Sequence, residues 1–112
     1  MTNKIYSMLG LAMKAGKLIT GSDVCERMIK SGKTVLVILA SDCSEGTCKK
    51  FKDMCTYRNI PIRIFGDKQS LGKYTGKNER VVLALSDKGF SEVIGKMIDE
   101  ISSLSGGEMN GR

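Results

Sequence analysis

The stretch Thr34-Val-Leu-Val-Ile-Leu-Ala40 decides the fold class. It is a continuous run of β-branched and apolar residues without polar alternation. Such a run predicts a strand that is buried on both faces of its sheet. The stretch from Val81 to Leu85 is a second run of the same kind. Strands buried on both faces need helices on each side, so the sequence predicts an α/β protein.

Helical and strand patterns alternate along the rest of the chain. The expected helices cover residues 5–13, ending near Gly16, residues 21–31, 44–58 and 67–75, and a last segment capped by Ser86-Asp87. The other expected strands cover residues 17–20 and 60–64, the latter half buried and placed at an edge by Pro61. The result is an α/β sandwich with about four strands in one sheet.

Several side chains carry specific expectations. In the second helix, Asp23 and Glu26 resemble a capping pattern. The expected buried face of this helix consists of Val24, Met28 and Ile29, and that of the last helix of Val93, Ile94, Met97, Ile98 and Ile101. We expect one domain over residues 1–104 and a disordered, Gly-rich tail over residues 105–112.

Composition excludes several classes of function. The 112 residues contain 18 Lys and Arg against 12 Asp and Glu, a net charge of +6, which favours a polyanionic partner. The chain has no His, so it lacks the commonest general base and every Ser-His-Asp or Cys-His triad. It has no apolar run long enough to span a membrane and no N-terminal signal region. A cytoplasmic location is therefore expected.

The four cysteines, Cys25, Cys43, Cys48 and Cys55, are expected to be reduced thiols. A secreted disulfide scaffold and a four-cysteine zinc site are the alternatives, but no Cys-x-x-Cys pair occurs. Cys48, Phe51 and Cys55 have helical spacing, so Cys48 and Cys55 are interpreted as small apolar residues on a buried helix face. No metal and no cofactor are predicted.

Two segments combine basic residues with glycines at expected helix ends. The first has Gly21 and Ser22 where a helix begins, so free backbone N–H groups there can bind a phosphate. Asp23 is either an ordinary cap or an acceptor for a guanine edge. The candidate binding residues of this segment are Lys14, Lys17, Gly21, Ser22, Asp23, Arg27 and Lys30.

The second segment runs from Asp67 to Arg80. It is not a phosphate-binding P-loop, because the spacing from Gly72 to Gly76 is wrong and no hydroxyl residue follows Lys77. Its side chains can bind phosphates, ribose or base edges, or they form a solvated turn. The candidate residues are Lys73, Gly76, Lys77, Asn78 and Arg80.

The segment Lys68-Gln-Ser-Leu71-Gly72-Lys73-Tyr-Thr-Gly76 resembles the Lys-x-x-Leu-Gly-x-x-x-Gly signature of the L7Ae family of ribosomal proteins. The segment Gly16-Lys17-Leu-Ile-Thr-Gly21 supports this resemblance, which covers residues 4–104 and is strongest to the bacterial YlxQ-type subgroup. It implies a single-domain three-layer α/β/α sandwich with a four-stranded mixed sheet. It also implies binding of kink-turn RNA.

The resemblance also implies where RNA would lie. The family contacts tandem sheared G·A pairs with a helix that opens on Gly-x-Asn-Glu. Here that segment is Gly21-Ser22-Asp23-Val24, with Asp23 in place of Asn and Val24 in place of Glu. The family's next basic residue falls on Arg27. The loop that packs on the extruded nucleotide is the polar segment Lys77-Asn78-Glu79-Arg80.

The leading expectation is a non-catalytic protein that binds structured RNA, kink-turn-like or otherwise ribosomal or regulatory. The ribosome is a candidate partner, and the free protein is expected to be a monomer. An alternative is a protein-interaction module of the translation or transcription machinery, which would carry an exposed apolar patch. A small enzyme would need a pocket with at least two convergent titratable groups.

Overall fold

The computed structural model describes residues 2–110, with side-chain surroundings through residue 103. Its elements, in chain order, are α1 (Thr2–Lys14), β1 (Leu18–Thr20), α2 (Ser22–Lys30), β2 (Leu36–Leu39), α3 (Glu45–Arg58), β3 (Ile62–Ile64), α4 (Lys68–Tyr74), β4 (Val82–Leu85) and α5 (Lys88–Asn110). Helices and strands therefore alternate along the chain, as the sequence patterns predict.

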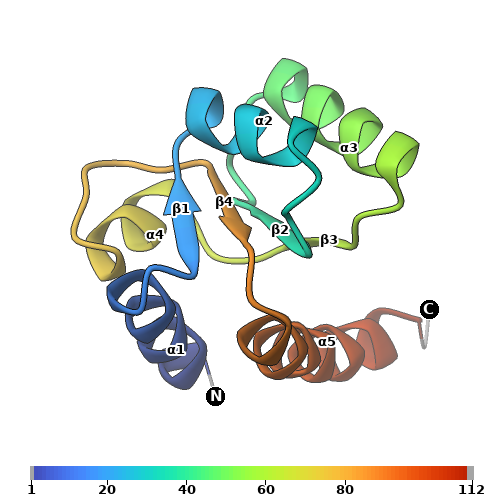
Figure 1. Ribbon diagram of the computed structural model, residues 1–112. Coiled ribbons are helices and arrows are strands. Elements are labelled where there is room, and N and C mark those ends of the chain that lie inside the picture. The colour runs from blue at the N-terminus through green and yellow to red at the C-terminus, as the bar shows by residue number, and fades with distance from the viewer. Residues whose placement is uncertain (1, 111–112) are drawn as a thin grey trace.

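The four strands form one mixed sheet in the order β1-β4-β2-β3 (Figure 1). β4 pairs antiparallel with β1 and with β2, and β2 pairs parallel with β3. The two strands with continuous apolar sequences, β2 and β4, are the central ones, and each of their residues is buried. β3 lies at an edge, and Pro61 directly precedes it.

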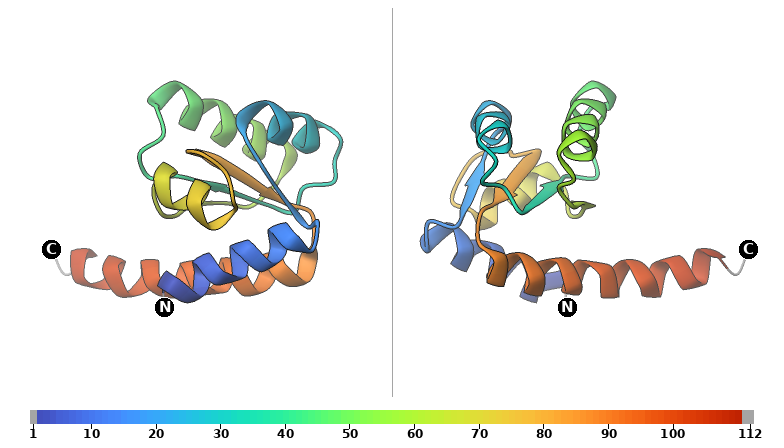
Figure 2. Two further views of the ribbon diagram at one scale, coloured as in Figure 1. Left: turned by 90° about the vertical axis from the view of Figure 1, so that its left-hand side faces the viewer. Right: turned by 45° about the vertical axis from the view of Figure 1, so that its right-hand side comes forward.

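Helices cover both faces of this sheet, as Figure 2 shows from two further sides. In β2, Leu36 and Ile38 pack in the core shared with α1 and α5, whereas Val37 and Leu39 pack in the core shared with α2 and α3. Residues in a strand point alternately to the two faces, so each central strand contributes to both cores. The expected three-layer α/β/α sandwich is confirmed.

Two helix faces differ from expectation. Val24 in α2 is 41% exposed and Val93 in α5 is 46% exposed, although both were expected to be buried. Buried positions in α5 include Ile94 and Ile98, four residues apart, so the helical rotation turns Val93 toward solvent. In α2 the buried pair is Cys25 and Ile29, which likewise leaves Val24 outside the core.

The start of α2 differs from expectation. The expected capping role of Asp23 is wrong, because the N-cap residue of α2 is Gly21 and no side chain caps this helix. Asp87 does cap α5, since its Oδ2 accepts a hydrogen bond from the Phe90 N–H at 2.8 Å. The first-turn N–H groups of α2 are therefore left without a side-chain partner.

The C-terminal segment was expected to be a disordered tail from Ser105. The structure continues α5 through Asn110, and residues 111–112 lie outside the described residues. The boundary between domain and tail stays a prediction. Within residues 2–110, no helix is both long and apolar enough to cross a membrane.

Candidate nucleic-acid interface

The two candidate segments meet at one end of the sheet. The Gly21 N–H donates to the Val82 carbonyl oxygen at 3.1 Å, which joins the start of α2 to the start of β4. The Arg80 Nε–H donates to Thr20 Oγ1 at 3.0 Å across 60 residues of chain. These bonds place the first turn of α2 beside the end of the α4–β4 loop.

The α4–β4 loop is held firmly against α4. A Cβ atom at Gly72 would lie only 1.9 Å from the Asn78 carbonyl oxygen, so the loop backbone occupies the space of a missing side chain. The Lys77 N–H donates to the Gly72 carbonyl at 2.8 Å, and the Arg80 N–H donates to the Lys68 carbonyl at 2.9 Å. The loop is therefore anchored at both ends.

The side chains of this loop face solvent. Lys73, Lys77 and Asn78 are exposed, and they line a shallow hollow of about 540 Å³. The Lys73 ammonium lies 5.7 Å from the ring centroid of Tyr74, which is 40% exposed. Gly76 has a φ of +73°, and no atom lies within 4 Å of a Cβ built there. Glycine is therefore favoured at this position because of its positive φ, and not because a side chain would collide with a neighbour.

The first turn of α2 presents backbone donors, with one correction. The first helical bond runs from the Cys25 N–H to the Gly21 carbonyl at 2.9 Å, so the N–H groups of Ser22, Asp23 and Val24 precede it. Gly21 was expected to offer its own N–H to a ligand. That N–H is already bonded to Val82, so this expectation is wrong for Gly21. Its φ of 99° shows why glycine fits this position.

The charged residues of α2 divide along the helix. Asp23 is exposed in the first turn, and Arg27 is exposed one turn further along the helix. Lys30, at its end, pairs with Glu26 at 2.9 Å, and Glu26 also pairs with Lys50 of α3 at 2.6 Å. Hydrogen bonds from these two lysines lower the pKa of the Glu26 carboxyl to about 2. Lys30 is therefore partly neutralised and distant from the first turn.

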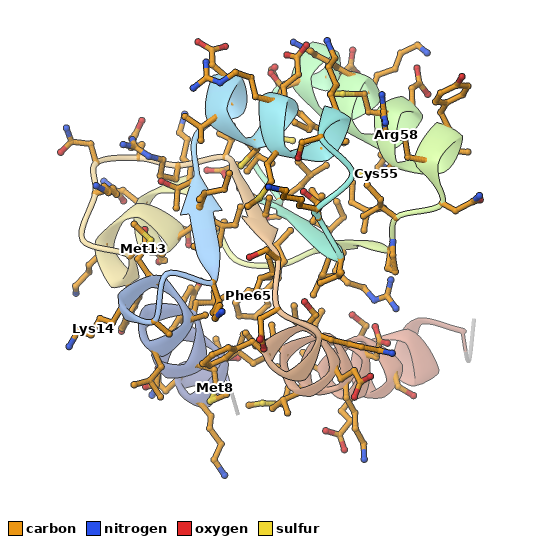
Figure 3. All side chains as sticks on the ribbon, viewed as in Figure 1. Met8, Met13, Lys14, Cys55, Arg58 and Phe65 are labelled. Carbon is orange, nitrogen blue, oxygen red and sulfur yellow. The ribbon has the colours of Figure 1, made fainter. Side chains whose placement is uncertain are left out.

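Lys14 and Lys17 lie away from the start of α2. The Lys17 carbonyl accepts a hydrogen bond from the Ser86 N–H at 3.0 Å. Lys17 directly precedes β1 and Gly21 directly follows it, so the two residues lie at opposite ends of this strand. Lys14 is the last residue of α1, and Figure 3 shows it on the side of the sheet away from α2. The structure thus places these two lysines away from the first turn of α2, and their part in RNA binding stays a prediction.

Residues 3–95 match the model of the ribosomal protein L7Ae/L30e/S12e/Gadd45 family. The chain belongs to this family. It is 35% identical over 94 residues to the RNA-binding protein YlxQ of Bacillus subtilis (strain 168), which covers 84% of this chain and 94% of that relative.

Two further proteins are similar to this chain. The large ribosomal subunit protein eL30 of Trypanosoma brucei brucei is 28% identical over 91 residues, 80% of this chain and 87% of that relative. A solved structure of a protein with unknown function from Bacillus halodurans C has a TM-score of 0.82 and 42% identity. The matched region covers 86% of this chain and 97% of the Bacillus halodurans chain. The expected family is confirmed.

Three positioning residues of this candidate interface were missed by sequence reasoning. Thr20 holds Arg80, and Gly72 gives the loop its space. Asp42, just after β2, accepts a hydrogen bond from the Lys68 N–H at 2.9 Å and so holds the start of α4. Gly72 lies in the family signature, but only the structure shows the close approach that it permits.

A separate hollow of about 810 Å³ lies between α5 and the β2–β3 end of the sheet. Its lining includes Val35, Pro61 and Gly95, together with the ion pair of Arg63 and Asp99 at 2.6 Å. None of the predicted binding residues lines it. The candidate interface and this hollow are therefore different surfaces.

Proposed function

We propose that this L7Ae-family protein binds structured RNA through the first turn of α2 and the α4–β4 loop. The observation that carries the proposal is the junction between them. Thr20 and Arg80, joined at 3.0 Å, place uncapped backbone N–H groups beside a loop of exposed basic side chains. Both kinds of donor bind backbone phosphates in nucleic-acid complexes. The similarity to the RNA-binding protein YlxQ and to the ribosomal protein eL30 supports RNA as the partner.

Each group has a proposed role that its position supports. The N–H groups of Ser22, Asp23 and Val24 bind a phosphate at the helix N-terminus. The exposed ammonium groups of Lys73 and Lys77 bind backbone phosphates, as does Arg27 on the second turn of α2.

The remaining contacts are to bases and sugars. The Asp23 carboxylate accepts hydrogen bonds from a guanine edge, and Asn78 contacts a base or ribose. The Arg80 side chain makes two hydrogen bonds within the protein: one guanidinium nitrogen donates to Thr20, and another donates to the Glu79 carbonyl at 2.9 Å. Its function is mainly to position the loop.

The proposed RNA is kink-turn-like or a related ribosomal or regulatory structure, and the proposed setting is a ribosome-associated protein in the cytoplasm. No catalytic role is proposed, because the matched family and relatives are ribosomal and RNA-binding proteins. A monomeric state of the free protein stays a prediction.

The test is a salt titration of binding to two RNAs of equal length. One contains a standard kink-turn with tandem G·A pairs, and the other is a plain duplex. We expect both to bind with a steep log–log salt slope, and the kink-turn to bind more tightly. Equal affinities would keep RNA binding but reject kink-turn preference. No binding to either RNA at low salt would reject the proposal and favour the protein-interaction alternative.

A further inference from the structure

Two of the four cysteines lie together at the start of α3. Cys43 directly precedes Ser44, the N-cap residue of α3, and Cys48 is the fourth residue of the helix. The Thr47 N–H donates to Ser44 Oγ at 3.2 Å and thereby holds the turn between the cysteines. In capped helices, the residue before the cap packs against the fourth helical residue. The cap therefore brings the two cysteine side chains together.

Other observations support this contact and show that the pair is accessible. The pKa of the Cys43 thiol is raised, first by burial and next by the neighbouring Cys48 thiol. Cys43 and Cys48 are only partly buried, and both line one surface hollow together with Lys49 and Lys52. A small molecule in solution can therefore reach this pair of thiols.

The other two cysteines have different surroundings. Cys25 and Cys55 are 0% exposed and belong to the core between the sheet and helices α2 and α3. Burial raises the pKa of Cys25 to about 12 and that of Cys55 to about 11. Reaction with a disulfide needs an accessible thiolate, so these two thiols are protected. They serve as internal controls.

We propose that Cys43 and Cys48 form a reversible dithiol–disulfide pair, a modification site whose oxidant is a small-molecule disulfide. The thiolate of one cysteine attacks the small disulfide, forms a mixed disulfide and expels one small thiolate. The other cysteine then attacks the protein sulfur of the mixed disulfide and expels the second small thiolate.

The reaction balances without another reagent. The two protein thiols lose two hydrogen atoms and form one S–S bond of about 2.05 Å, while the small disulfide is reduced to two thiols. An excess of small thiol reverses both steps. The site lies next to Asp42, which holds the start of α4, so the modification falls beside the proposed RNA interface.

The test is oxidation of the native protein with glutathione disulfide, followed by trypsin digestion without reductant and mass spectrometry. Cys43 and Cys48 fall in one tryptic peptide, residues 34–49, whereas Cys25 falls in residues 18–27 and Cys55 in residues 53–58. We expect the 34–49 peptide to lose the mass of two hydrogen atoms and to regain it with dithiothreitol. The other two peptides are expected to be unchanged.

Two variants complete the test. In Cys48→Ser and in Cys43→Ser, whose folding is checked by circular dichroism, the two-hydrogen loss is expected to disappear. The remaining thiol then stays free or retains one glutathione. Two glutathiones on the wild-type 34–49 peptide, or a cross-link from it to another peptide, would overturn the proposal. The readout is a covalent mass, so its result is independent of RNA binding.

Discussion

Gly72 shows how a single residue without a side chain permits the α4–β4 loop to close. The Asn78 carbonyl oxygen occupies the position next to its Cα, and the Lys77 N–H is bonded to its carbonyl. Backbone atoms cannot move aside as the end of a flexible side chain can. The requirement for glycine here is therefore steric, whereas at Gly76 it comes from a φ of +73°.

Gly72→Ala is expected to reduce the free energy of unfolding by about 3 kcal/mol or more, because the new methyl group collides with backbone. Urea denaturation of the variant and the wild type measures this loss. Gly46→Ala in α3 is the matched control, since no atom lies within 4 Å of a Cβ at Gly46. That change should stabilise the protein by about 0.5–1 kcal/mol. Equal effects of the two changes would contradict the steric explanation.

Asp23 and Val24 are the residues at which specificity for RNA can be tested. Val24 is 41% exposed, so a polar residue in its place costs little folding energy. The double change Asp23→Asn with Val24→Glu restores the Asn-Glu pair that the L7Ae family resemblance implies. We expect it to strengthen kink-turn binding about tenfold or more, since a base-specific contact contributes roughly 1–3 kcal/mol.

The control for this change is the plain duplex, whose affinity should change little. Electrophoretic mobility shift or fluorescence anisotropy titrations with both RNAs give the comparison. Because the double change leaves the net charge unaltered, a parallel change in both affinities would mean that the new pair makes contacts that do not depend on the RNA structure. No change with either RNA would remove the first turn of α2 from the interface.

At the scale of elements, Glu26 connects α2 to α3. Its carboxylate pairs with Lys30 on its own helix and with Lys50 on the neighbouring helix. These contacts lower its pKa from 4.5 to about 2 in the folded protein. A carboxyl with a lowered folded-state pKa stabilises the fold above its unfolded pKa and loses this effect as the pH falls.

The wild-type protein is therefore expected to lose unfolding free energy as the pH falls from about 5 toward 2, and Glu26→Gln should lose less over the same range. Denaturant titrations at several pH values measure both curves. Asp53→Asn is the control, because Asp53 pairs with Lys49 within one helix and its side chain is 67% exposed. Identical pH profiles for wild type and Glu26→Gln would show that the pair contributes nothing.

At the scale of the whole molecule, the net charge of +6 comes from basic residues in different parts of the fold. Lys73 lies in the last turn of α4 and Lys77 on the loop that follows it. Lys17 lies at the end of β1 opposite to Gly21, and Lys30 is paired with Glu26. Only phosphate contacts within the interface release counterions on binding. Position in the fold, rather than charge alone, should decide which lysines contribute.

Lys77→Ala is expected to reduce the log–log salt slope of RNA binding by about one unit. Lys17→Ala removes the same charge from the other end of β1 and should leave the slope nearly unchanged. Fluorescence anisotropy at several salt concentrations gives both slopes. A loss of one unit in both variants would indicate nonspecific attraction to the whole basic surface. An unchanged slope for Lys77→Ala would exclude Lys77 from the interface.

Sequence patterns predicted the elements well and the site only in part. Periodicity within short segments revealed both central strands and the order of the helices. It misplaced Val24 and Val93, because a helix buries only the stripe that meets its neighbours. It also grouped Lys14 and Lys17 with Gly21 because they are close in the chain. β1 carries the chain to the other end of the sheet between Lys17 and Gly21.

The sequence by itself determined the α/β architecture, since runs such as Leu36 to Ala40 record burial on both faces in consecutive residues. Only the tertiary structure decided which charged residues share a surface. The bond between Arg80 and Thr20 joins residues 60 positions apart, and the Gly21 N–H is bonded to Val82. Local patterns depend on neighbours in the chain, whereas a binding surface depends on which distant segments pack together.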